Sequence, residues 1–136
     1  MEKVFVDTDI VLDLLSNREP FYKHSAYLFS EADEGKMKIF VSSLSFSNLN
    51  YILSKQYSPD QARKKLLKFK TLVTVLAVTD KVVELALSSD FKDFEDGLQY
   101  FTSIENNIHT LLTRNLKDYK TAEIPVMTAE QFLKGR

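Results

Sequence analysis

The stretch VFVDTDIVLDLL, residues 4–15, decides how the chain begins to fold, because an acidic residue closes a short apolar run. A hydrophobic burst that ends at Asp7 is typical of a buried strand. The apolar residues that follow recur at helical spacing: Ile10, Val11, Leu14 and Leu15. The stretch therefore predicts a strand followed by a helix, with Asp7 at the junction, where it either caps the helix or binds a ligand.

The length and composition of the chain indicate one domain. Residues 1–136, of which 44% are hydrophobic, are expected to bury a single core. A formal net charge of -1 lacks the basic excess of a dedicated duplex-binding protein. The absence of cysteine excludes a disulfide framework and a thiolate metal site. With no basic leader and no long apolar run, we expect a cytoplasmic protein that does not contact a membrane.

Short apolar segments alternate along the chain with longer amphipathic ones. The apolar segments have the length of strands and lie at residues 3–6, 38–43, 72–78, 109–114 and 124–127. Between them, helical spacing predicts a helix stopped by Gly35, one through residues 46–53, one that begins at Ser58, two capped by Asp80 and Asp93, and a short C-terminal one. This alternation predicts an α/β fold of three α/β/α layers, with a central, mainly parallel sheet of about five strands.

Polar residues follow several of the predicted strands at the point where each strand ends. Asp7 follows the first strand, Ser42 and Ser43 follow the second, and residues 113–115 follow the fourth. In an open parallel sheet, ligands bind beyond the carboxyl ends of the strands. We therefore expect these residues to meet at one edge of the sheet.

The acidic residues near this edge have two interpretations. Taken singly, they are helix caps and turn residues: Asp93 with Asp96 resembles a capping box, and Asp118 suits a turn. Taken together, carboxylates gathered at one edge repel each other unless a cation neutralises them. Oxygen ligands without a His or Cys cluster favour Mg²⁺ or Mn²⁺ over zinc. Such an ion activates water, and phosphodiester hydrolysis is the chemistry that follows.

Asp9 and Asp13 are expected to have a simpler role than Asp7. Both lie in the first turns of the predicted helix, where the helix dipole favours negative charge and where solvent can receive the side chains.

At this point the sequence resembles a known family, the PIN domain, a metal-dependent ribonuclease fold, and is similar to its bacterial VapC-like toxin type. VDTDIVLDLL is similar to the opening strand and helix of that family. DFEDGLQYFTSIENN is similar to its third acidic segment, and LLTRNLKDYKTAEIPVMTAEQFL to its closing strand, loop and helix. The resemblance implies an endoribonuclease that acts on single-stranded RNA, paired with a small antitoxin protein and assembled as a homodimer.

The resemblance also implies a set of site residues. The first acidic position of the family falls on Asp7 and the third on Asp96, with Asp93 as an accessory carboxylate. The fourth falls on the loop TRNLKD, where we favour Asp118 for the charge and Asn115 for a polar contact. Thr113 of the same motif is expected to order a metal-bound water. Asp7, Asp96 and Asp118 are thus the predicted metal ligands and catalytic residues.

One departure from the family pattern bears on activity. The family usually has a glutamate on the helix after the second strand, and Asn48 stands at that position here. An amide offers an oxygen ligand but neither a negative charge nor a general base. Two readings follow: a ribonuclease with a weakened metal site, or a catalytically impaired PIN-like module that binds RNA or protein.

An enzyme of a different class is a third alternative. DTDIV after a strand fits the opening motif of haloacid dehalogenase-like phosphatases, in which Asp7 and Asp9 would carry the chemistry. This alternative ranks lower, because TRNLKD stands where a lysine and a pair of acidic residues are expected and because the chain is short for that fold.

Overall fold

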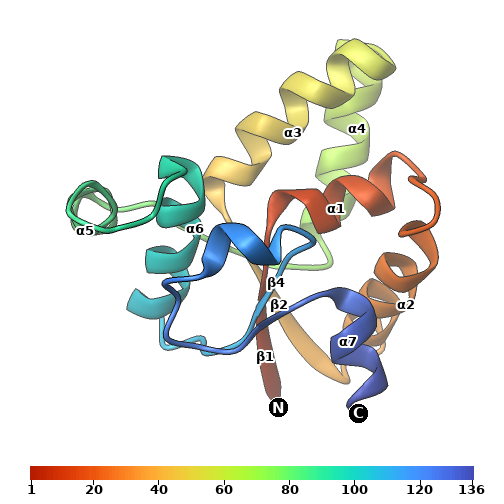
Figure 1. The fold of residues 1–136 in the computed structure, drawn as a ribbon. Coiled ribbons are helices and arrows are strands. Elements are labelled where there is room, and N and C mark those ends of the chain that lie inside the picture. The colour runs from red at the N-terminus through yellow and green to blue at the C-terminus, as the bar shows by residue number, and fades with distance from the viewer.

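A computed structural model describes residues 1–136 and contains a five-stranded sheet with helices on both faces (Figure 1). The strands are β1 (Glu2–Val6), β2 (Met37–Ser42), β3 (Thr74–Leu76), β4 (Leu111–Leu112) and β5 (Val126–Met127). The helices are α1 (Thr8–Leu15), α2 (Tyr22–Asp33), α3 (Ser43–Gln56), α4 (Pro59–Lys70), α5 (Asp80–Leu87), α6 (Phe94–Glu105) and α7 (Ala129–Lys134), with a 3₁₀ turn η1 (Leu116–Tyr119).

The sheet has the strand order β3-β2-β1-β4-β5, and every neighbouring pair is parallel. The prediction of a parallel, five-stranded sheet in an α/β fold is therefore confirmed. Because β1 is the central strand, the residue that follows it lies at the middle of the carboxyl edge of the sheet. That residue is Asp7.

The alternation of side chains along the strands builds the layers on the two faces. Val4 and Val6 of β1 belong to the main apolar core with residues of α1, α2, α3, α4 and α7. Phe5 points to the opposite face and packs in a second core with Tyr100 of α6 and Tyr119 of η1. Figure 1 shows the resulting layers, with α5 and α6 on one side of the sheet and α2 and α7 on the other.

Several boundaries differ from the sequence prediction. The third, fourth and fifth strands are shorter than expected, because pairing in the ladder covers only residues 74–76, 111–112 and 126–127. Asp80 was expected to cap α5, but Thr79 is the cap: its hydroxyl accepts a hydrogen bond from the amide of Val82 at 3.2 Å. Gly35 does stop α2, with a positive φ of 77° that suits glycine.

The helices also bear on the membrane question. None of them combines the length and the apolar character that a bilayer-spanning helix needs.

Candidate functional site

An acidic cavity of about 720 Å³ opens at the carboxyl edge of the sheet, between α1, α3 and the start of α6. Fourteen residues line it, and six of them are acidic: Asp7, Asp9, Asp93, Glu95, Asp96 and Asp118. None of the lining residues is Lys, Arg or His. The edge of the sheet that the sequence pointed to therefore carries a concentration of uncompensated negative charge.

Asp7 is fixed by donors from four parts of the chain. It lies at the N-terminus of α1, buried at 6% exposure, and its Oδ1 accepts from the amide of Thr8 at 2.7 Å. Its Oδ2 accepts from the hydroxyls of Thr113 at 3.0 Å and Tyr119 at 2.9 Å. Gln99 donates to Oδ1 at 3.4 Å. Asp7 thus caps α1 and also faces the cavity, so the two interpretations of this residue are compatible.

Gln99 connects the elements around Asp7, a role that the sequence analysis missed. Its Nε2 contacts Thr8 at 3.2 Å and Ser45 at 3.0 Å as well as Asp7, and its Oε1 accepts from Ser42 at 2.6 Å. A buried amide with partners on both of its polar ends ties α6 to the ends of β1 and β2. Nothing in the sequence marks it, because its partners lie at least 54 residues away.

Asp93 and Asp96 reach the cavity from the first turn of α6. Asp93 is the N-cap, and its carboxylate accepts from the amide of Asp96 at 3.1 Å, which confirms its predicted capping role. The hydroxyl of Tyr119 donates to Asp7 and lies 3.5 Å from Oδ1 of Asp96. One phenol therefore contacts both carboxylates, although 89 residues separate them in the chain. Tyr119 is a second residue that the sequence analysis missed.

The cavity raises the pKa of its acidic groups. The pKa of Asp96 is about 7, because burial and the charges on Asp7, Asp93 and Asp118 disfavour its ionised form. Burial raises the pKa of Asp9 to about 6, and the charge on Asp7 adds to this effect. Burial also raises the pKa of Asp7, against the hydrogen bonds that favour its charge. The cavity is thus an environment that a cation would stabilise.

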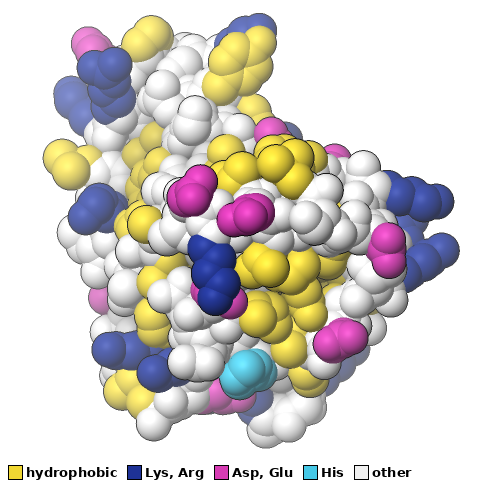
Figure 2. All heavy atoms as spheres, turned by 90° about the vertical axis from the view of Figure 1, so that its left-hand side faces the viewer, with side chains coloured by type: hydrophobic (Ala, Val, Ile, Leu, Met, Phe, Trp, Pro, Cys, Tyr) yellow, Lys and Arg dark blue, Asp and Glu magenta, His cyan; other side chains and the backbone are white.

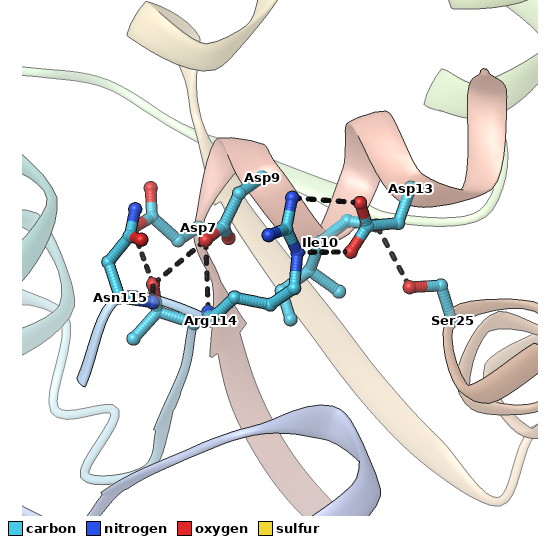
Figure 3. Close-up of polar contacts among 8 residues, drawn as sticks. Asp7, Asp9, Ile10, Asp13, Ser25, Arg114 and Asn115 are labelled. Carbon is cyan, nitrogen blue, oxygen red and sulfur yellow. Dashed lines mark hydrogen bonds and ion pairs between the residues drawn. The ribbon is translucent and has the colours of Figure 1, made fainter. Parts of the chain in front are cut away.

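Asp9 and Asp13 do not point into solvent, contrary to expectation. Figure 3 shows Arg114 between them: its guanidinium binds Asp13 at 2.7 and 3.1 Å, and its backbone amide donates to Asp9 at 2.9 Å. Asp13 is fully buried, and Arg114 also stacks on Phe21 at 4.2 Å from the ring centroid. Asp13 and Arg114 therefore form a structural pair that fastens the loop after β4 to α1.

The remaining predicted residues lie at or behind the cavity wall. Asn48, Asn115 and Asp118 line it, and Thr113 is buried beneath it. The hydroxyl of Thr113 contacts Asp7 and, at 3.3 Å, Asp9; its expected role in ordering a metal-bound water stays a prediction. Asn48 contacts Glu95, another lining residue that the sequence analysis did not select, at 3.3 Å.

The chemistry of these donors fits a hard divalent cation. The cavity offers carboxylate and amide oxygens without sulfur or imidazole, which suits Mg²⁺ or Mn²⁺. Oδ1 of Asp9 is buried without a hydrogen-bond partner, a cost that a bound cation or water would remove. As the side chains stand, no group of three or more Asp, Glu, His or Cys residues is arranged to hold an ion. A cation shared by Asp7 and Asp96 would therefore require these side chains to adjust, because the hydroxyl of Tyr119 contacts both carboxylates.

Comparisons of the sequence with known proteins place this geometry in context. Residues 3–117 match the family described as the PIN domain. The chain is also 30% identical over 139 residues to "Ribonuclease VapC1" of Aquifex aeolicus (strain VF5), a match that covers 96% of this chain and 93% of the relative.

Solved structures share the fold at lower sequence identity. VapBC2 from Rickettsia felis, solved with a DNA fragment from its promoter, superimposes with a TM-score of 0.69 at 20% identity, over 92% of this chain and 96% of the other. The Mycobacterium tuberculosis toxin VapC20, described as cleaving the sarcin-ricin loop, gives 0.69 at 16% identity, over 89% and 95%. A toxin-antitoxin complex from Klebsiella pneumoniae gives 0.64 at 22% identity, over 93% and 97%. These likenesses confirm the expected three-layer fold.

Proposed function

Since the chain belongs to the PIN domain family, we propose that residues 1–136 form one PIN-like domain that acts as a metal-dependent endoribonuclease on single-stranded RNA. The observation that supports this most strongly is the cavity itself, whose lining includes six carboxylates and no basic side chain. Carboxylates at this density repel an RNA phosphate until a cation neutralises them. A protein that handles RNA through this cavity therefore needs the cation.

Asp7, Asp96 and Asp118 are the proposed metal ligands and catalytic residues, with Mg²⁺ or Mn²⁺ as the ion. Bound there, such an ion activates water and stabilises charge on a phosphoryl group. The other site residues hold these three side chains in position. Thr113 orients Asp7 through its hydroxyl, and Asp93 fixes the first turn of α6, which carries Asp96.

Asn48 and Asn115 are proposed as accessory polar groups on the cavity wall. Neither carries charge, so each can contact substrate or solvent without adding to the repulsion. Tyr51 also lines the cavity and is 63% exposed, one turn beyond Asn48 on α3. An exposed aromatic ring beside the acidic residues offers a stacking surface for an unpaired base. This favours single-stranded RNA over a duplex, whose bases are already stacked.

The direct test is cleavage of labelled RNA by the purified protein with Mn²⁺. We expect cutting of an unstructured RNA, little cutting of a duplex, and loss of activity in EDTA. Asp7→Asn removes one carboxylate charge and is expected to reduce the rate by about 100-fold or more. Equal cleavage by the wild-type protein and Asp7→Asn would show that the activity comes from a contaminant.

The second candidate is an impaired PIN-like module that binds RNA or protein without cutting, and Asn48 is the observation that favours it. It predicts that RNA binds in the presence of Mn²⁺ and remains intact. No observation favours the phosphatase alternative, since Oδ2 of Asp9 accepts from the amide of Arg114 and the hydroxyl of Thr113 rather than facing a leaving group.

We further propose that the protein is a cytoplasmic toxin that assembles as a homodimer and pairs with a small antitoxin. The Klebsiella pneumoniae relative is a toxin-antitoxin complex, which supports such a partner.

Figure 2 shows hydrophobic side chains gathered on the α5–α6 side, where Leu87 is 70% and Phe94 44% exposed. An exposed apolar surface of this kind suits a subunit interface. Light scattering of the purified chain should give the mass of a pair, and a monomer mass would contradict the homodimer.

Coexpression with the product of the adjacent gene should give a stable complex in gel filtration, and separate elution of the two would contradict the antitoxin.

A further inference from the structure

The wall of the cavity contains a contact between α3 and α6 that involves the one position where an acidic residue is missing. Nδ2 of Asn48 donates to Oε2 of Glu95 at 3.3 Å, across 47 residues of sequence. Both side chains line the cavity together with Asp7 and Asp96. The carboxylate of Glu95 thus lies beside position 48, within hydrogen-bond reach of its side chain.

The charge of Glu95 is not used elsewhere in the protein. The side chain is exposed, and it forms no ion pair with a lysine, arginine or histidine. Its polar contact is with Asn48, whose amide group is a neutral donor. A glutamate at position 48 would instead repel Glu95 at this distance. Asparagine at 48 and glutamate at 95 are therefore a complementary pair.

We infer that Glu95 supplies from α6 the acidic side chain that α3 lacks at position 48, and that Asn48 positions it by hydrogen bonding. This inference rests on the proposed function, because it concerns the same cation site. The cavity thereby has a carboxylate at this place although the family's usual glutamate is absent from position 48. Asn48 is then a positioning residue rather than a defect of the site.

The test is calorimetric titration of the metal-free protein with Mn²⁺, which measures binding without requiring turnover. Glu95→Gln is expected to raise the dissociation constant for Mn²⁺ roughly 10-fold, the lower end of the effect of groups that surround metal ligands. Glu84→Gln is the matched control, since Glu84 is an exposed residue of α5 outside the cavity, and its substitution should leave the affinity unchanged. Thermal unfolding of each variant checks that the fold is retained.

The exchange of the two residues gives a sharper result. Asn48→Glu is expected to recover most of the lost Mn²⁺ affinity in the Glu95→Gln background, because position 48 then supplies from α3 the carboxylate that α6 has lost. In the wild-type background it should give little gain, since Glu95 already supplies the carboxylate on this side of the cavity. Equal gains in both backgrounds would overturn the inference.

The outcomes separate this inference from the proposed function. If Glu95→Gln binds Mn²⁺ as tightly as the wild-type protein while Asp7→Asn does not bind, the cation site stands and the role of Glu95 is wrong. If the wild-type protein itself shows no saturable heat with Mn²⁺, both proposals are wrong.

Discussion

At the scale of single residues, the pKa of Asp96 is the property of the cavity that is easiest to test. Burial and neighbouring charges raise its pKa to about 7, whereas an unfolded aspartate titrates near ~3.9. The folded state therefore favours the protonated carboxyl. The stability that this contributes is fully present below the unfolded pKa and is lost as the pH rises through about 7.

Asp96→Asn replaces the carboxyl with a neutral amide and is expected to stabilise the metal-free protein at high pH. At pH 8 the melting temperature should rise by about 2–5 °C, whereas at pH 4.5 most of the gain should disappear. Thermal unfolding in EDTA at the two pH values measures this. Asp90→Asn, an exposed residue outside the cavity, is the control and should show no such pH dependence. An identical shift at both pH values for Asp96→Asn would argue against electrostatic strain at this site.

At the scale of elements, the loop after β4 is held against α1 by Arg114 and Asp13. Arg114→Met leaves the fully buried Asp13 carboxylate without its cation, and we expect a loss of about 3 kcal/mol or more in the free energy of unfolding. Urea unfolding measures the loss. Lys117→Met removes an exposed charge from the same loop and should change stability by less than about 0.5 kcal/mol.

Adding Asp13→Asn to Arg114→Met should recover part of the lost stability, because no buried charge then remains unpaired. A double variant as unstable as Arg114→Met would indicate that Arg114 acts through its packing on Phe21 instead.

The elements and the strand-end acidic residues could be predicted from the sequence because both depend on local patterns. Periods of two and 3.6 residues predict strands and helices, and Asp7 was selected as the residue that ends an apolar strand. Gln99 and Tyr119 were missed because their partners are brought close only by the folded chain. In sequence, each lies in an apolar helical or turn segment that is equally consistent with packing. Glu95 was missed because its hydrogen-bond partner, Asn48, lies on another helix and 47 residues away in the sequence.

At the scale of the whole molecule, the parallel sheet is what concentrates the charge. Asp7 follows its central strand, and α6, η1 and α3 bring Asp96, Asp118 and Asn48 to the same cavity. The net charge of the chain is only -1, so this acidity is local. The proposed function therefore depends on the carboxylates sharing one cation in that cavity.

Anomalous diffraction from crystals of the metal-free protein soaked in Mn²⁺ would show whether a cation binds there. We expect one strong manganese peak in the cavity, within direct coordination distance, about 2–2.6 Å, of carboxylate oxygens of both Asp7 and Asp96. We also expect the peak to be absent from crystals of Asp7→Asn. A fully soaked wild-type crystal with no peak in the cavity, or with manganese bound only at unrelated surface carboxylates, would contradict the proposed function.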